Sequence, residues 1–133
     1  MRSDTQTVTI AARPDRVLAY VGDGANLPRW AIGFAQSVRR HGSGWLVTTG
    51  RGEVPTTITV DDTAGTIDFR MRATADTDAA AYCRVVPNGE GSEFIFTQLQ
   101  QPGVTDELFA QLVAAVGHEL VALKAQLEVE CPL

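Results

Sequence analysis

Apolar and polar residues alternate in short segments through the first three quarters of the chain. The opening segment, residues 7–12, alternates Thr7 and Thr9 with the apolar Val8 and Ile10, which is the two-residue period of a half-buried strand. Turn-forming Gly, Asp, Asn and Pro residues separate six further segments of this kind between residues 36 and 100. These predicted strands are 37–40, 45–49, 54–60, 66–73, 79–86 and 93–100. Because the connections are short, we expect neighbouring strands to pair antiparallel, giving about seven strands with the first.

Two short helices are expected between the first two strands. Pro14 suits a first helical turn, where its missing N–H would have no partner in any case. The segment 22–24, Gly-Asp-Gly, ends that helix, and Asn26 is the predicted cap of the next one. The apolar residues on these helices are Val17, Leu18 and Val21 in the first and Leu27 and Trp30 in the second.

A longer helix is predicted at the end of the chain. Thr105 is its expected N-cap, and Asp106 and Glu107 complement the helix dipole in its first turn. Steps of three and four residues then separate the members of one apolar stripe: Phe109, Val113, Val116, Leu120, Leu123 and Leu127. About 20 residues of helix span roughly 30 Å, which is enough to cross a sheet.

Length and composition limit the classes of protein that fit. The 133 residues suit one domain, and with 44% hydrophobic residues the chain can bury a core without a metal or disulfide. A net charge of −5 and no extended basic patch argue against nucleic-acid binding. The charge is uneven, because residues 1–51 carry a net +4 and residues 52–133 a net −9. We expect a cytoplasmic protein with no signal peptide, no membrane span and no disulfide between Cys83 and Cys131.

Three local strings resemble one protein superfamily. Residues 8–17 look like its first strand running into a proline-initiated helix, residues 26–30 like its second helix, and residues 85–92 like its penultimate hairpin. The chain thus resembles the START-like SRPBCC superfamily, near its polyketide cyclase/dehydrase members, from about residue 6 to 128. This resemblance implies an α+β helix-grip fold: one domain over residues 1–133 in which a curved, about seven-stranded antiparallel sheet wraps the C-terminal helix. The NTF2-like fold ranks second, because its long helices come first.

The resemblance also implies a cavity between the sheet and the last helix that binds a hydrophobic small molecule. If one face of each strand lies against the helix, alternate residues along the strand point inward. On the strand 93–100 the set Phe94, Phe96 and Gln98 is preferred, although Ile95, Thr97 and Leu99 are nearly as apolar. The other inward positions are Val8, Ile10, Val54, Thr56, Ile58, Val60, Ile67, Phe69, Met71, Cys83 and Val85. The predicted ligand-binding residues are Trp30, Thr56, Ile58, Phe69, Met71, Cys83, Phe94, Phe96, Gln98, Phe109, Val113 and Gly117.

Three of these residues have two interpretations. A buried Gln98 amide must find partners, either locally at the strand end or on a carbonyl or hydroxyl of a ligand. Gly117 interrupts the inner stripe of the helix, either because a side chain there would collide with the sheet or because the gap is ligand volume. Trp30, near the presumed mouth, is a lid or a wall, whereas Trp45 fits ordinary sheet packing.

No catalytic set stands out. His118 falls off the apolar stripe and His41 lies in a turn, so both are expected in solvent, as is Glu53. Cys83 has no neighbour that would make it a thiolate. The spacing of the Cys and His residues fits no metal site, and the Gly89-x-Gly91 pair precedes a strand and so fails as a dinucleotide-binding turn.

We therefore expect a protein that binds a hydrophobic or aromatic small molecule without a cofactor, as a monomer or homodimer. A polyketide aromatase/cyclase-like enzyme is an alternative, since shaping a reactive chain in a cavity needs few polar groups. In that case Gln98, with Glu53 or His41, would orient the substrate or move protons. A co-chaperone-like interaction domain is the third possibility, and whether any reaction is catalysed stays open.

Overall fold

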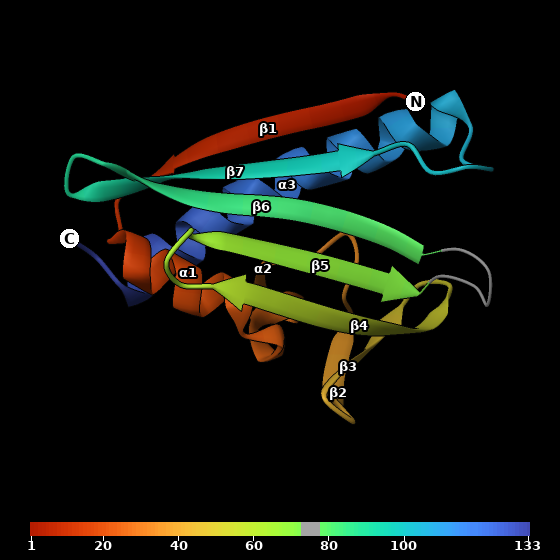
Figure 1. The fold of residues 1–133 in the computed structure, drawn as a ribbon, viewed down its shortest axis with the longest axis horizontal. Helices are drawn as coiled ribbons and strands as arrows, with labels where there is room; N and C mark the ends of the chain where they lie inside the picture. The colour runs from red at the N-terminus through yellow and green to blue at the C-terminus, as the bar shows by residue number, and fades with distance from the viewer. Residues whose placement is uncertain (73–77) are drawn as a thin grey trace.

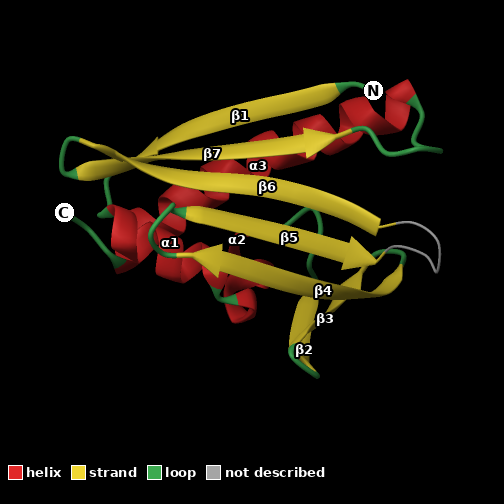
Figure 2. Cartoon of the chain, in the orientation of Figure 1, coloured by secondary structure: helices red, strands yellow, loops and turns green. Residues whose placement is uncertain are grey.

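A computed structural model describes residues 1–72 and 78–133 as one antiparallel sheet with three α-helices and a short 3-10 helix (Figures 1 and 2). Each expected strand and helix is present, although the first strand begins four residues earlier and ends two residues earlier than expected. Ala73, the predicted end of a strand, lies outside the described residues. In chain order the elements are β1 (Ser3–Ile10), α1 (Pro14–Gly22), η1 (Gly24–Asn26), α2 (Leu27–Trp30), β2 (Ser37–His41), β3 (Gly44–Thr49), β4 (Gly52–Asp61), β5 (Thr66–Arg72), β6 (Asp78–Asn88), β7 (Gly91–Leu99) and α3 (Asp106–Glu130).

The sheet joins the two ends of the chain. Its order is β1-β7-β6-β5-β4-β3-β2 and every neighbouring pair is antiparallel. Strands β2 to β7 follow one another as a meander, and β1 returns to pair with β7. The sheet curves along α3, and α1 and α2 lie at the opposite end from the N-terminus of α3 (Figure 1). The helix-grip architecture expected from the sequence is confirmed.

Strand parity sets which side chains face α3. Ile67 and Phe69 of β5 are buried while Arg70 is exposed, and Phe94 and Phe96 of β7 are both buried. This confirms the preferred parity of the last strand over its alternative. Val60 of β4 keeps the inward parity but is 39% exposed, because it lies at the end of its strand.

The capping of the short helices differs from the expectation in one place. The Asn26 side chain does not cap α2, because its Nδ2 donates instead to the Tyr20 carbonyl at 3.0 Å. Asp23 is the capping residue of this segment, and its Oδ1 accepts from the Ala25 N–H at 3.0 Å, at the start of η1. The prediction missed η1 because a three-residue 3-10 turn leaves no apolar periodicity to detect.

The long helix α3 begins where the sequence predicts. Thr105 Oγ1 accepts from the Leu108 N–H at 3.1 Å and caps it. The helix runs for 25 residues, five more than expected, and buries Val116, Leu120 and Leu123 against the sheet. Helix α3 is also long and apolar enough to cross a membrane, although no membrane span was expected from the sequence. Its apolar stripe nevertheless belongs to the core of the domain.

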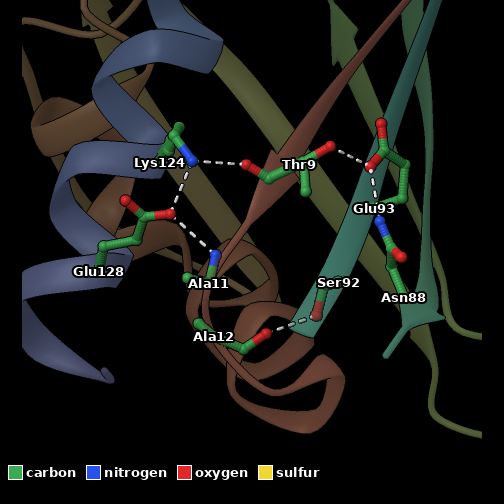
Figure 3. Close-up of polar contacts among 8 residues, drawn as sticks. All are labelled: Thr9, Ala11, Ala12, Asn88, Ser92, Glu93, Lys124 and Glu128. Carbon is green, nitrogen blue, oxygen red and sulfur yellow. Dashed lines mark hydrogen bonds and ion pairs between the residues drawn. The ribbon is translucent and has the colours of Figure 1, made fainter. Parts of the chain in front are cut away.

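Polar contacts fix the second half of α3 to β1 (Figure 3). Lys124 Nζ donates to the Thr9 carbonyl at 2.8 Å and to Glu128 Oε2 at 2.7 Å. The same Glu128 oxygen accepts from the Ala11 N–H at 2.8 Å. On the far side of β1, Thr9 Oγ1 donates to Glu93 of β7 at 2.6 Å. These hydrogen bonds connect α3, the edge strand β1 and its neighbour β7 around residue Thr9.

The uneven charge of the sequence has a structural counterpart. Three of the surface ion pairs join an arginine of the first third of the chain to an acid of the remainder, so the two parts face one another across the fold. Exposed pairs of this kind contribute little to stability. The pairs are Arg2–Asp106 at 3.4 Å, Arg29–Glu130 at 3.2 Å and Arg39–Glu53 at 3.2 Å.

The junction between β1 and α1 gives a test of the packing. Ser92 Oγ donates to the Ala12 carbonyl at 2.7 Å, and both residues are fully buried (Figure 3). Ser92→Ala leaves that carbonyl unpaired, so we expect the free energy of unfolding in urea to fall by about 1–3 kcal/mol. Ser37→Ala on the exposed β2 strand is the control, and an equal loss in both variants would contradict the assignment.

Candidate functional site

The interface between the sheet and α3 is closed at one end and open at the other. Around α1 the inward side chains have no exposed surface: these are Ile10, Val17, Val21, Ile67, Phe94, Leu123 and Leu127. At the other end β5 and β7 finish and α3 starts (Figure 1). Several inward residues there are half-buried. We define the open half by four of them: Met71, Ala79, Gln98 and Val113. These side chains keep part of their surface exposed at this end.

Small side chains line the inner face of β6. Ala79, Ala81 and Cys83 occupy three successive inward positions of that strand. Longer side chains flank them, since Ala79 is paired with Met71 of β5 and Ala81 is paired with Gln98 of β7. The inner face of β6 is therefore lined by shorter side chains than those paired with it on β5 and β7.

Gln98 places an unpaired amide at the edge of this row. It stands opposite Ala81 on one side and Asp4 on the other. Its Nε2 is buried and has no hydrogen-bond partner in the described part of the chain. The interpretation in which the amide bonds locally at the strand end therefore does not hold for Nε2. Leaving such a donor unpaired costs about 1–3 kcal/mol, which a ligand oxygen would recover.

Trp30 lies deeper than its place on a short helix suggested. It is 2% exposed and makes edge contacts with Phe69, at 6.3 Å between ring centroids, and with Phe94, at 6.4 Å. Trp30 is therefore a buried residue of the core and not an exposed lid, and its contact with a ligand stays a prediction. Its indole N–H is a second buried donor that has no partner among the described residues.

Glu119 of α3 is a buried acid that the apolar pattern of the sequence does not predict. It is 6% exposed, and its Oε2 accepts from the Gly33 N–H at 3.2 Å, at the loop after α2. Loss of hydration on burial raises the pKa of this carboxyl to about 7, and the Gly33 contact offsets only part of that effect. The spacing of the helix does hint at its burial. Glu119 falls three residues after Val116 and four before Leu123, on the flank of the buried stripe.

Two of the predicted ligand-binding residues have structural contacts of their own. Phe109 is buried at the start of α3 beneath the Arg2 guanidinium, 5.5 Å from its ring centroid, and is not part of the contiguous core. Gly117 faces β1, where an added Cβ would come within 3.3 Å of Gln6 Oε1. Gln6 Nε2 donates to the Val113 carbonyl at 2.9 Å, so Gly117 permits β1 and α3 to approach closely. This geometry favours the collision interpretation of the glycine.

The remaining predicted residues face the interior. Thr56, Cys83 and Phe96 are buried and Ile58 is half-buried. Burial raises the pKa of the Cys83 thiol, with nearby Asp68 adding to the effect, which keeps it protonated and unreactive. Trp45 packs against Gly24, as expected of a structural residue, with the Arg40 guanidinium 4.5 Å above its ring.

Histidines and metal ligands do not gather in this region. His41, His118 and Glu53 are exposed, as the sequence predicted, and Glu53 pairs with Arg39. Within residues 1–72 and 78–133, no group of three or more His, Cys, Asp or Glu side chains is arranged to hold a metal. Both cysteines are free.

Two surface hollows lie outside the interface. One, of about 720 Å³, is bounded by α1, the β4–β5 turn and the end of β6. The other, of about 380 Å³, lies beside Lys124 and the β6–β7 hairpin. Neither is lined by a predicted ligand-binding residue, so the ligand assignment of those residues stays a prediction.

Comparison with known proteins identifies relatives of the whole chain. A family model described as "Polyketide cyclase / dehydrase and lipid transport" matches residues 1–128. No curated protein gives a significant match. Among solved structures, the Aha1 dimer from Colwellia psychrerythraea superposes with a TM-score of 0.76 at 16% identity, over 97% of this chain and 98% of that one.

Two further structures share the fold. A START superfamily protein from Mycobacterium smegmatis gives a TM-score of 0.71 at 16% identity, covering 95% of this chain and 97% of the other. The two-domain ARO/CYC protein BexL gives 0.72 at 19% identity, over 98% of this chain but 48% of that protein. At these identities the structural likeness establishes the fold alone.

Glu119 makes the stability depend on pH. Its pKa is about 7 in the folded protein against 4.5 as the ordinary value, so the folded state holds the extra proton between these values. The free energy of unfolding then falls as pH rises from 4.5 through 7. We expect Glu119→Gln to be nearly neutral at pH 4.5 and more stable than the wild type at pH 8, by up to about 3 kcal/mol. Urea unfolding at the two pH values measures this, with Glu107→Gln on the surface as control; parallel pH curves for wild type and Glu119→Gln would contradict the burial of the charge.

Proposed function

The chain belongs to the polyketide cyclase / dehydrase and lipid transport family, and on that premise we propose that it binds a hydrophobic or aromatic small molecule between its sheet and α3. The family and fold are consistent with hydrophobic ligand binding. The proposed site is the open half, with the small side chains of β6 as its floor. Met71, Gln98 and Val113 are the members of the predicted lining that belong to this open half, and each keeps some accessible surface.

The unpaired Gln98 amide is the observation that carries this proposal. A half-buried apolar surface with one oriented polar group is the usual composition of a small-molecule site. Gln98 supplies that group beside Ala81, where a ring could lie flat against the sheet. Because Nε2 is a donor, the ligand offers an acceptor oxygen, such as a ketone, quinone or hydroxyl.

The half-buried residues on the inner face also favour ligand binding over the alternative of an interaction domain that works through its outer surface. Such a domain has no need of accessible residues on the concave side of its sheet. A packed interior at Met71, Ala79 and Val113 would have supported it, and the exposure of these residues supports ligand binding instead.

A cyclase-like activity is the second candidate, and Glu119 is the observation that favours it. A carboxyl with a pKa of about 7 can give up and take back a proton near neutral pH, as a general acid or base must. The ARO/CYC protein among the structural neighbours shares the fold of this chain. Under this candidate Gln98 would orient the substrate, and the binding step would be the same.

Filling the open half tests the proposed site. Ala79→Phe places a ring beside Met71, so we expect the Kd of 2-acetylnaphthalene to rise roughly tenfold or more, measured by fluorescence titration. Ala80→Phe is a matched control, because the neighbouring residue points to the other face of the sheet. Val113→Phe enters the same space from α3 and serves if Ala79→Phe fails to fold.

The outcome separates the alternatives. Weakened binding in Ala79→Phe and Val113→Phe, with unchanged binding in Ala80→Phe, supports the proposed site. Equal affinity in all three variants, each shown to be folded by circular dichroism, would place the ligand elsewhere.

Gln98 can be tested through ligand preference. Gln98→Leu keeps the size of the side chain and removes the donor, so the wild-type preference for 2-acetylnaphthalene over 2-isopropylnaphthalene, expected at roughly two- to tenfold, should disappear. The unliganded variant should also gain stability, because the unpaired buried amide is gone. A variant that retained the full preference for the ketone would show that Gln98 does not contact its oxygen.

A further inference from the structure

The hollow beside α1 is separate from the proposed site. It lies at the closed end of the fold, between α1, the turn that joins β4 to β5, and the last residues of β6. Its volume of about 720 Å³ falls inside the usual range for small-molecule sites. The core residues behind it have no accessible surface, so this hollow does not communicate with the open half through the interior.

The floor of the hollow is apolar. Leu18 of α1 and Val85 of β6 are almost fully buried, while Val60 at the end of β4 keeps 39% of its surface exposed. Ala19 and Ala64 stand on opposite walls and are exposed. An exposed valine between two short side chains leaves apolar surface that a bound group could cover.

The walls are held in place by close backbone contacts. A Cβ on Gly22 would lie 2.7 Å from Val60 Cγ2, which shows how closely α1 approaches β4. Gly65 has φ +73°, and a Cβ there would meet the Val85 carbonyl at 2.7 Å. Asp61 Oδ1 accepts from the Thr63 and Ala64 N–H groups and closes the turn. The hollow is therefore a fixed feature of the packing.

The rim of the hollow is acidic. Asp15 and Asp23 stand on the α1 side and Asp62 on the turn, against one cation, Arg84 of β6. Asp15 is largely exposed and lies 3.6 Å from Arg13, and Asp23 caps the start of η1. Three acids and one base give the lining a net charge of −2, which attracts cations.

We propose that this hollow binds a small organic cation with an apolar body, such as a protonated primary amine on an aromatic or alkyl group. The apolar part covers Leu18, Val60 and Val85, and the ammonium group lies among the aspartates of the rim. This second site does not depend on the proposed function, because it uses no residue of the open half.

The experiment compares three molecules that differ only in their end group. The full chain, labelled with ¹⁵N, is titrated with 4-phenylbutylamine, 4-phenylbutanol and 4-phenylbutyrate, and amide shifts are followed by NMR. The amine should give saturable shifts at Ala19, Ala64 and Val86, with a Kd lower than that of the alcohol and much lower than that of the carboxylate. Its affinity should fall with added salt, because the rim is exposed.

Matched variants localise the effect. Ala19→Trp fills the hollow and should abolish these shifts, whereas Ala125→Trp, an exposed alanine on α3, should leave them unchanged. Asp62→Asn should weaken the amine roughly two- to fivefold and leave the alcohol unchanged, with Glu107→Gln as the charge-matched control.

Three results would overturn the proposal: equal affinities for the amine, the alcohol and the carboxylate; unchanged amine binding in a folded Ala19→Trp variant; or saturable shifts confined to the amides around Ala79 and Gln98. The last result would place the amine in the open half and leave the proposed function standing. Failure of the proposed function would be recorded separately, in the titrations with 2-acetylnaphthalene.

Discussion

The fold depends on the attachment of α3 to β1, the strand that joins the two ends of the chain. Gln6 of β1 bonds the Val113 carbonyl near the start of the helix, and Lys124 and Glu128 bond the backbone of β1 at residues 9 and 11 near its end. With the helix held along one edge strand, the rest of the sheet curves over it. Helix α1 packs against the sheet at one end, and at the other end several inward residues of the described chain stay half-buried.

Three polar groups in the interior work against the stability of this arrangement. The Gln98 amide and the Trp30 indole each have a buried N–H group that lacks a partner among the described residues. The Glu119 carboxyl is buried as well. Each of these groups lowers the stability of the fold relative to an apolar side chain of the same size. Such costs concentrate where a protein binds or transforms a ligand. The ligand proposed above would relieve one of these costs, by accepting a hydrogen bond from the Gln98 amide.

Periodicity in the sequence predicts most of the fold, because one face of each strand and one stripe of α3 must leave water. The inward side of β5 and the Thr105 cap were predicted correctly on this basis. Features set by tertiary contacts were less well defined by it: the depth of Trp30 was not predicted, and Gly117 kept two interpretations, of which its close approach to Gln6 favours the collision. Glu119 escaped detection because a carboxylate on the flank of an apolar stripe ordinarily lies in water, and only packing against Gly33 shows that this one does not.

The most direct test of the central claim is the set of intermolecular NOEs between bound 2-acetylnaphthalene and the methyl groups of the protein. The account predicts contacts to the Met71 and Val113 methyls of the open half, and none to Leu127 at the closed end. Contacts confined to the closed end, or to methyl groups on the outer surface such as those of Val121 and Val129, would contradict it.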